Sequence, residues 1–391
     1  MDMEEKDYIP SDELYANYKA LSWKYIIDNA QEREEQVIKF HESFPDYGPT
    51  PLKEIPNAAS FGVGRIFVKE ESYRFGLPSF KILGASWAIY SCLAKEFNLS
   101  LDTTFSKLIE TMENLSLDRR FVFVCATDGN HGRAVAKIAT MLGARSQVYV
   151  PGSVPMAECK KIESEGNVCL IQIPGDYDDA VAMAAKFCKE EPNSFLIQDV
   201  SFENYTEIPQ AICDGYNTVL NEIDQQVYSK CGLKPSLVIC GAGVGSFAQS
   251  VVAHYRSEFR ENFETKVMIA EPKFSHTCNK SLTLGYPARS NFESGPPTIM
   301  DGLNCPSISS ISFPILKNGL SFSLLIDDGE CHNLICELKK FNVSSGPCGA
   351  APYASFKKHF SELISRGDLT DTDVVVLIST EKERGYAFPL L

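Results

Sequence analysis

The sequence has no long run of basic residues, no C-x-x-C pair and no long apolar segment. Acidic residues outnumber basic ones by 51 to 37, which gives a net charge of -14. Because nucleic-acid binding depends on clustered lysine and arginine, this balance argues against a nucleic-acid partner. A helix that spans a bilayer needs about 20 mainly apolar residues. No such stretch occurs, so we expect no membrane partner either.

Cysteine usage and the first residues bear on the compartment. The 13 cysteines are scattered from Cys92 to Cys348 and their number is odd, which is typical of reduced thiols in a cytosolic enzyme. Residues 1–6 are acidic and no apolar stretch follows them, so they lack the character of a secretory or transit peptide. These features predict a cytoplasmic protein. His276 and His332 lie near cysteines without further ligands at metal-site spacing, so no metal site is expected.

The composition is typical of a globular protein, with 44% hydrophobic residues. The length of 391 residues is enough for two domains. Residues 11–44 predict one or two amphipathic helices. Further on, apolar strand patterns alternate with helical patterns, which is typical of parallel sheets with crossover helices. Strands are expected at residues 65–70, 121–126, 147–151, 168–173, 195–199, 236–240, 266–270 and 374–378.

A lysine stands where a polar, glycine-containing turn meets an apolar helix. We call residues 74–81 (Arg-Phe-Gly-Leu-Pro-Ser-Phe-Lys) the lysine turn; it leads into the apolar residues 82–90. Desolvation at Lys81 would favour the neutral amine, which is a nucleophile that can form a Schiff base with an aldehyde. The alternative is a surface lysine whose stem lies on apolar neighbours. The octapeptide alone favours that alternative.

Two more turns follow apolar strands and lead into helices. Residues 127–132 (Thr-Asp-Gly-Asn-His-Gly) can present helix N–H groups to a carboxylate, with Asp128 as a base and Asn130 as a donor, although a purely structural turn is equally expected. Residues 241–246 (Gly-Ala-Gly-Val-Gly-Ser) fit a phosphate, because glycine allows close backbone approach. A dinucleotide site using Glu271 is an alternative, but the pattern departs from G-x-G-x-x-G at the last glycine.

Two strand ends carry further polar side chains. Asp199 ends the strand 195–199, where a helix-capping role is commoner than a catalytic one. The last strand ends in Ser379, Thr380 and Glu381. A hydroxyl there can hydrogen-bond a pyridine nitrogen without protonating it, whereas a carboxylate would stabilise the pyridinium.

Together these segments resemble the pyridoxal-phosphate enzymes of the tryptophan-synthase-β-like fold (fold type II), and among them they look most like the diaminopropionate ammonia-lyases. Asp128 is the distinctive residue, because the ordinary dehydratases of this fold usually carry serine in that place. The matching segments run nearly end to end: Phe44-Pro45, Pro49-Thr50-Pro51-Leu52, Arg74-Phe75-Gly76-Leu77, Phe80-Lys81-Ile82-Leu83-Gly84, Thr127-Asp128-Gly129-Asn130-His131-Gly132-Arg133, Gln198-Asp199 and Glu271-Pro272.

The resemblance implies an α/β protein of two domains, with open, twisted, mainly parallel sheets flanked by helices. Residues 1–84 and 206–391 would form a large cofactor-binding domain, and residues 85–205 a small inserted one. The implied cofactor is pyridoxal 5'-phosphate, held in the cleft between the domains, and the implied assembly is a homodimer. The chain departs from the family pattern at residues 78–79, 301–304 and 382–384.

The resemblance also assigns roles. Lys81, Asp128 and Asp199 would be catalytic, and Lys81 would bind the cofactor as a Schiff base. Asn130 would contact the phenolic oxygen of the cofactor. The remaining cofactor contacts would come from Phe80, from Gly241, Gly243, Val244, Gly245 and Ser246 at the phosphate, and from Ser379 or Thr380 at the pyridine nitrogen.

The implied reaction is α,β-elimination of 2,3-diaminopropionate to pyruvate and ammonia. An amine leaves poorly unless it is protonated, so an acid near the β-carbon has a physical purpose, and Asp128 and Asp199 are the candidates. Three alternatives remain: a lyase, dehydratase or β-replacement synthase for another β-substituted amino acid such as serine or threonine, a binding or regulatory protein without turnover, and an NAD-dependent oxidoreductase.

Overall fold

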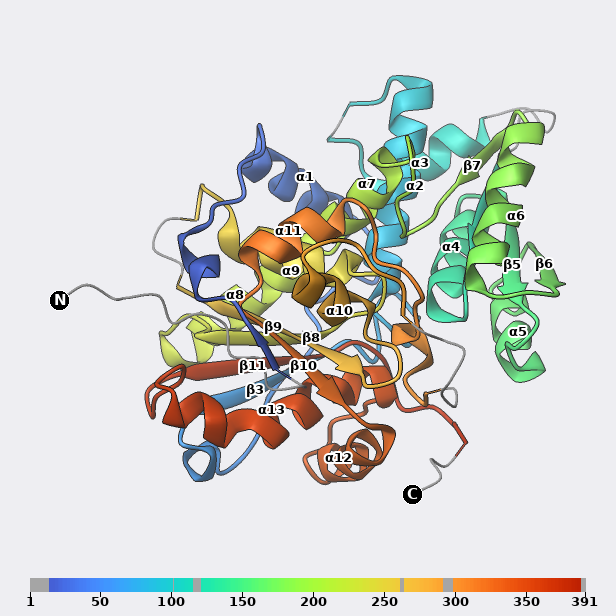
Figure 1. Cartoon of the computed structure of the whole chain (residues 1–391). Coiled ribbons are helices and arrows are strands. Elements are labelled where there is room, and N and C mark those ends of the chain that lie inside the picture. Colours follow the sequence, from blue (N-terminus) through green and yellow to red (C-terminus); the bar gives the residue numbers. More distant parts are fainter. Residues whose placement is uncertain (1–13, 101, 115–120, 261–263, 291–297, 388–391) are drawn as a thin grey trace.

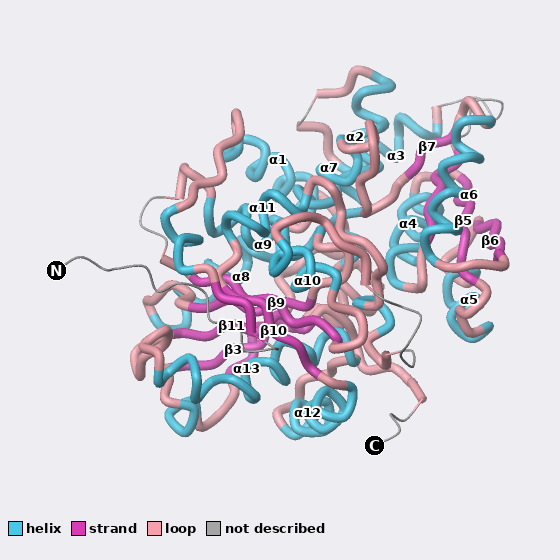
Figure 2. Tube along the Cα trace, viewed as in Figure 1, coloured by secondary structure: helices cyan, strands magenta, loops and turns pink. Residues whose placement is uncertain are grey.

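The computed structural model describes residues 14–100, 102–114, 121–260, 264–290 and 298–387. These residues form two sheets, one of seven strands and one of four, with helices packed around both (Figure 1). Figure 2 shows the strands as two separate groups. The expected α/β class with mainly parallel sheets is confirmed.

The larger sheet is parallel inside and antiparallel at its edges. The five inner strands pair in parallel, and β1 and β2 close the two edges in the antiparallel sense. Its order is β1 (Leu14–Ala16), β10 (Phe322–Ile326), β9 (Lys266–Pro272), β8 (Leu237–Gly241), β11 (Val374–Ser379), β3 (Arg65–Glu70) and β2 (Leu52–Glu54).

Helices cover both faces of this sheet, so its inner strands are apolar on both sides. In β8, Val238 and Cys240 pack into one core cluster while Leu237 and Ile239 pack into another. On one face lie α7 (Glu207–Gly215), α8 (Asn217–Cys231), α9 (Ser246–Arg256), α10 (Thr277–Leu284) and α11 (Ser312–Gly319), and on the other α12 (Asp328–Lys340) and α13 (Pro347–Ser365) (Figure 1).

The smaller sheet is parallel throughout. Its order is β6 (Val168–Ile173), β5 (Arg145–Pro151), β4 (Val122–Ala126) and β7 (Ser194–Leu196), and its helices are α4 (Asn130–Met141), α5 (Met156–Glu163) and α6 (Tyr177–Glu190). The helix α2 (Lys81–Phe97) packs against both α7 and α4. It therefore connects the two sheets, and the lysine stands at its first residue.

The amino-terminal part differs from the expected one or two helices over residues 11–44, of which 11–13 lie outside the described residues. Only α1 (Ala30–Glu42) is an α-helix there; Leu14–Ala16 is a strand, and Tyr18–Ser22 forms one short 3-10 helix. The strand forms because β10 offers it a pairing edge, and a local pattern cannot reveal so distant a partner. The described residues also contain the short helices α3 (Phe105–Glu113), Ala58–Phe61 and Asp301–Leu303. In the described ranges, no helix has the length and apolar character needed to cross a bilayer.

Candidate active site

One cavity lies at the carboxyl ends of strands from both sheets, the usual location of sites in open α/β sheets. The turns after β3, β4, β8 and β11 all contribute to its wall. The structure brings together almost every residue that the sequence suggested for the site. Its lining includes Phe80, Lys81, Asp128, Asn130, Asp199, Gly241, Gly243, Val244, Gly245, Ser246 and Thr380.

Lys81 lies against Asp199 rather than alone. Its Nζ donates a hydrogen bond to Asp199 Oδ2 at 2.7 Å, and its side chain is 23% exposed. Burial acts to lower the pKa of Lys81, but the charge and hydrogen bond of Asp199 outweigh it and raise that pKa well above its ordinary value. The expectation of a neutral amine from desolvation is therefore wrong for the free chain. The amine is an ammonium ion held by a carboxylate.

Asp199 is held in turn by neighbours that stabilise its charge. Tyr177 donates to its Oδ1 at 3.3 Å, and Tyr177 itself accepts a hydrogen bond from Gln198 Nε2 at 2.7 Å. Burial would raise the pKa of Asp199, yet Lys81 and these hydrogen bonds hold it well below its usual range. Tyr177 also lines the cavity. The sequence did not single it out, because its role depends on a contact 22 residues away.

Asp128 has the opposite electrostatic environment. It follows β4, in a turn held by Thr127, whose Oγ1 accepts the backbone N–H groups of Gly129 and Gly132 at 2.9 and 3.1 Å. Burial, together with the negative charges of Asp301 and Asp199, raises the pKa of Asp128 to about 7. One cavity thus contains two carboxyl groups whose pKa values are shifted in opposite directions, which is how a site separates its acid from its permanent anion.

The glycine-rich turn forms a narrow cradle at the start of α9. A Cβ at Gly243 would lie 2.9 Å from Cys305 Sγ and 3.0 Å from the Gly302 carbonyl oxygen. Gly245 has a φ of 94°, which favours glycine. A side chain at either position would block the cradle or strain it. The backbone N–H groups at the start of α9 therefore remain open to an anion.

Comparisons with known proteins identify the family of this chain. The family model described as pyridoxal-phosphate dependent enzyme matches residues 44–381. The chain belongs to that family. It is 32% identical over 362 residues to the diaminopropionate ammonia-lyase of Salmonella typhimurium, covering 88% of each protein. It is also 32% identical over 291 residues to the Escherichia coli diaminopropionate ammonia-lyase, covering 74% of this chain and 70% of that one.

Solved structures extend the comparison to three dimensions. The Escherichia coli diaminopropionate ammonia lyase in complex with D-serine superposes with a TM-score of 0.82 at 27% identity, covering 94% of this chain and 93% of that one. The same enzyme in complex with an aminoacrylate-PLP azomethine reaction intermediate gives a TM-score of 0.80 with the same coverage. The expected fold type II architecture is thereby confirmed.

The residues of this pyridoxal-phosphate dependent enzyme fit the cofactor in two respects. The amine of Lys81 opens onto the cavity from the first residue of α2. The glycine cradle leaves room for an anion beside α9, as the phosphate requires. The alternative of a dinucleotide site requires Glu271 to be free to bind a ligand. Glu271 is instead fully buried, and its two oxygens accept the backbone N–H groups of Cys278 and Asn279.

The end of β11 differs in detail from expectation. Thr380 and Glu381 line the cavity, whereas Ser379 is 1% exposed and its Oγ donates to Ser345 Oγ at 2.8 Å. Glu381 and Arg384, which the sequence did not single out as site residues, also reach the cavity. No group of three or more His, Cys, Asp or Glu side chains in the described residues is arranged to hold a metal ion.

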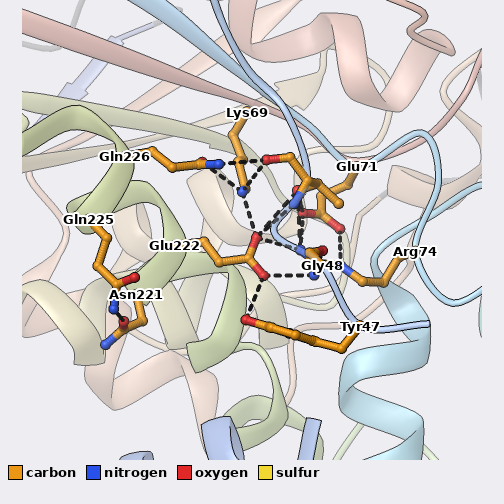
Figure 3. A network of polar contacts seen from close by, with 10 residues as sticks. Tyr47, Gly48, Lys69, Glu71, Arg74, Asn221, Glu222, Gln225 and Gln226 are labelled. Carbon is orange, nitrogen blue, oxygen red and sulfur yellow. Dashed lines mark hydrogen bonds and ion pairs between the residues drawn. The ribbon is translucent and has the colours of Figure 1, made fainter. Parts of the chain in front are cut away.

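A buried polar network fixes the lysine turn of this enzyme (Figure 3). Arg74 donates to Glu71 Oε1 and to Glu222 Oε1, each at 2.7 Å, and Lys69 donates to Glu222 Oε2 at 2.6 Å. The four side chains are at most 4% exposed. Two cations and two carboxylates therefore neutralise one another inside the protein, and Thr50 joins them through a hydrogen bond to Glu71.

The same network holds a strained turn. Arg74 and Leu77 exchange backbone hydrogen bonds of 2.8 and 2.9 Å, which closes a tight turn over Phe75 and Gly76. Phe75 has a φ of 48°, an uncommon conformation for a large side chain. Its ring stacks on Phe44 at 4.4 Å. Packing and the Arg74 ion pairs thus keep the chain in a conformation that the turn alone would not favour.

Proposed function

We propose that the chain catalyses α,β-elimination of 2,3-diaminopropionate to pyruvate and ammonia. The observation that carries this proposal is a cavity lined by Lys81, Asp128 and Asp199, in which Lys81 Nζ donates to Asp199 Oδ2 at 2.7 Å. The Salmonella and Escherichia coli relatives bear the name of this activity. When bound, pyridoxal phosphate supplies the electron sink that stabilises the negative charge left by removal of an α-proton.

The chain's own residues handle the protons. Asp199 stays ionised and orients Lys81 Nζ through the 2.7 Å contact. Lys81 and Asp128 both line the cavity. In this proposal the ionised Asp128 carboxylate accepts the α-proton of one enantiomer, and the Lys81 amine, in its neutral form, accepts that of the other. Asp128 also donates a proton to the departing β-amine, because a pKa of about 7 leaves it partly protonated at neutral pH. Asp199 does not donate it, since its lowered pKa keeps it ionised.

Binding roles follow from the same geometry. The backbone of Gly241, Gly243, Val244, Gly245 and Ser246 would hold the phosphate, Asn130 the phenolic oxygen, and Thr380 rather than Ser379 the pyridine nitrogen. Phe80 packs beside the lysine, with its ring 4.3 Å from that of Phe247. The substrate is a small amino acid.

The larger organisation is proposed on the same basis. Residues 1–84 with 206–391 and residues 85–205 form the two domains, a division supported by the two sheets, with α2 running across the first boundary. A homodimer is the assembly that the family resemblance implies, and light scattering tests it. A cytoplasmic location is supported by the absence of disulfides among the 13 cysteines, all of which are in the described residues.

The decisive assay mixes the cofactor-loaded chain with L- and D-2,3-diaminopropionate, L-serine and L-threonine. Visible absorbance follows the cofactor, and a coupled assay measures the 2-oxo acid. We expect pyruvate from diaminopropionate much faster than from serine. Faster turnover of serine or threonine would instead favour a dehydratase. A cofactor spectrum that responds to substrate without any 2-oxo acid would favour β-replacement chemistry or a binding role.

The two enantiomers should show opposite pH dependence near pH 7. Where Asp128 accepts the α-proton it must be ionised, so kcat/KM rises with pH through about 7. Where Lys81 accepts it, Asp128 must stay protonated for the leaving amine, so kcat/KM falls through the same range. Measuring kcat/KM from pH 5.5 to 8.5 for each enantiomer checks this.

Asp128→Asn should remove the pH dependence near 7 for both enantiomers. It should also lower kcat/KM by about 10²- to 10⁴-fold, the usual contribution of a general acid or base. Glu163→Gln, on the surface of α5, serves as the control because it removes a carboxylate away from the cavity lining. If Asp128→Asn keeps the pH dependence near 7 for either enantiomer, the proton roles given to Asp128 are wrong.

A further inference from the structure

Glu381 lies where the lysine turn, α4 and α13 meet. It is 4% exposed and lines the cavity. Its Oε2 accepts a hydrogen bond from Asn130 Nδ2 at 3.0 Å. Its Oε1 accepts one from the backbone N–H of Cys348 at 3.1 Å and lies 3.5 Å from Arg384 Nε. The carboxylate therefore receives donors on both of its oxygens.

The backbone of Glu381 is fixed as well. It forms a bridge with Ser79, two residues before Lys81, and its carbonyl oxygen accepts the Gly346 N–H at 3.1 Å. A Cβ at Gly346 would lie 2.5 Å from Glu381 Oε1, so the carboxylate fills space that any side chain at position 346 would need. Glu381 thus joins the turn that carries Lys81 to the helix that Asn130 begins.

An amide nitrogen carries two N–H groups, and Glu381 binds one of those of Asn130, which leaves the other for the cavity. We propose that Glu381 is a positioning residue, which fixes the Asn130 amide with its nitrogen directed at the phenolic oxygen of the cofactor. This inference rests on the proposed function only as far as cofactor binding, because turnover of a particular substrate is no part of it.

Glutamine at position 381 is informative because it keeps the shape of glutamate and replaces one acceptor with a donor. The Cys348 N–H and Arg384 Nε both need an acceptor, so the glutamine oxygen stays on their side. Its nitrogen then faces Asn130, whose amide must rotate to present its oxygen instead. The rotated amide no longer directs an N–H at the phenolic oxygen.

The test compares Glu381→Gln, Asn130→Ala and the double variant as whole chains stripped of cofactor. Pyridoxal phosphate is titrated back, and visible absorbance and protein fluorescence give its Kd. We expect Glu381→Gln to weaken Kd about tenfold and to shift the visible absorbance maximum, since a charge-assisted hydrogen bond is lost. The control Glu383→Gln should change neither, because Glu383 is half exposed and pairs with Lys339 at 2.9 Å.

The double variant decides whether Glu381 acts through Asn130. Its Kd should be no weaker than that of Asn130→Ala alone, because one side chain acts through the other. Effects that multiply would overturn the proposal, as would an unchanged Kd and spectrum in Glu381→Gln. Thermal unfolding of each cofactor-free variant checks that the chain is folded.

A second pair of variants covers the case in which Glu381→Gln alone does not fold. Asn130→Asp places two carboxylates face to face, so it should lower the melting temperature of the cofactor-free chain, and adding Glu381→Gln restores a complementary donor. We expect the double variant Asn130→Asp/Glu381→Gln to recover the melting temperature but to keep a Kd about tenfold or more weaker than wild type, because position 130 no longer directs an N–H at the phenolic oxygen. A double variant with the wild-type Kd, or one whose melting temperature does not recover, would overturn the proposal.

These measurements remain distinct from the activity assay. A wild-type chain that binds the cofactor but releases no pyruvate from diaminopropionate would defeat the proposed function and leave the Glu381 comparison intact. A wild-type chain with no measurable cofactor affinity would overturn both.

Discussion

Lys81→Ala is expected to abolish turnover and the visible absorbance of the bound cofactor. Removing a group that forms a covalent bond in a reaction typically lowers the rate by at least about a thousandfold. The substitution should also lower the melting temperature, because the buried Asp199 is left without the ammonium ion that lies 2.7 Å from it. An absorbance spectrum after loading and a single-turnover assay measure the result.

The double variant Lys81→Ala/Asp199→Asn separates the effect of the missing amine from the effect of the broken ion pair. Neutralising Asp199 removes the uncompensated buried charge, so the melting temperature should return toward that of the wild type. Turnover should stay lost, because the amine is still missing. A single variant Lys81→Ala that keeps the cofactor spectrum and the activity would show that another residue binds the cofactor.

Arg74→Met is expected to destabilise the cofactor-free chain by about 3–5 kcal/mol, the usual result of removing one partner from a buried ion pair. Glu71 and Glu222 would lose their 2.7 Å contacts with the guanidinium and remain buried as carboxylates. The strained turn at Phe75 would lose its main polar restraint in the same step. Urea unfolding, followed by circular dichroism, gives the free energy of unfolding.

Arg65→Met is the matched control. Arg65 pairs with Glu54 at 3.2 Å, but both side chains are more than 40% exposed, so its loss should cost about 1 kcal/mol or less. If Arg74→Met costs no more than Arg65→Met, the buried network does not stabilise the lysine turn. Loading the folded fraction of Arg74→Met with cofactor then shows whether Lys81 is still presented correctly.

Local patterns predicted the parts of the fold that are locally determined. The strands β4 and β8 are continuous apolar runs, and each leads through a turn into a helix, so their positions agree with expectation. The edge strands β1 and β2, each of three residues, carry no such run. They exist because β10 and β3 offer them pairing edges, and nothing in their own residues reveals those partners.

The site divides in the same way. Turn chemistry marked Lys81, Asp128 and Asn130, because a strand, a glycine-containing turn and a helix follow one another in the sequence. The protonation of Lys81 was predicted wrongly, since Asp199, whose charge keeps it an ammonium ion, is 118 residues away. Glu381 was missed as a site residue for a similar reason: its partner Asn130 lies 251 residues earlier in the chain.

The place of β11 in the larger sheet has a consequence for biosynthesis. β11 is the last of the described strands in the chain, yet it pairs with β3 on one side and β8 on the other, at the centre of the sheet. Until it emerges from the ribosome, β2 and β3 have no connection to the rest of their sheet. At that stage the lysine turn also lacks its hydrogen bond to Thr380, whose carbonyl oxygen accepts the Phe80 N–H. A nascent chain in which β11 is still inside the ribosome therefore lacks both the centre of its larger sheet and one contact of the lysine turn.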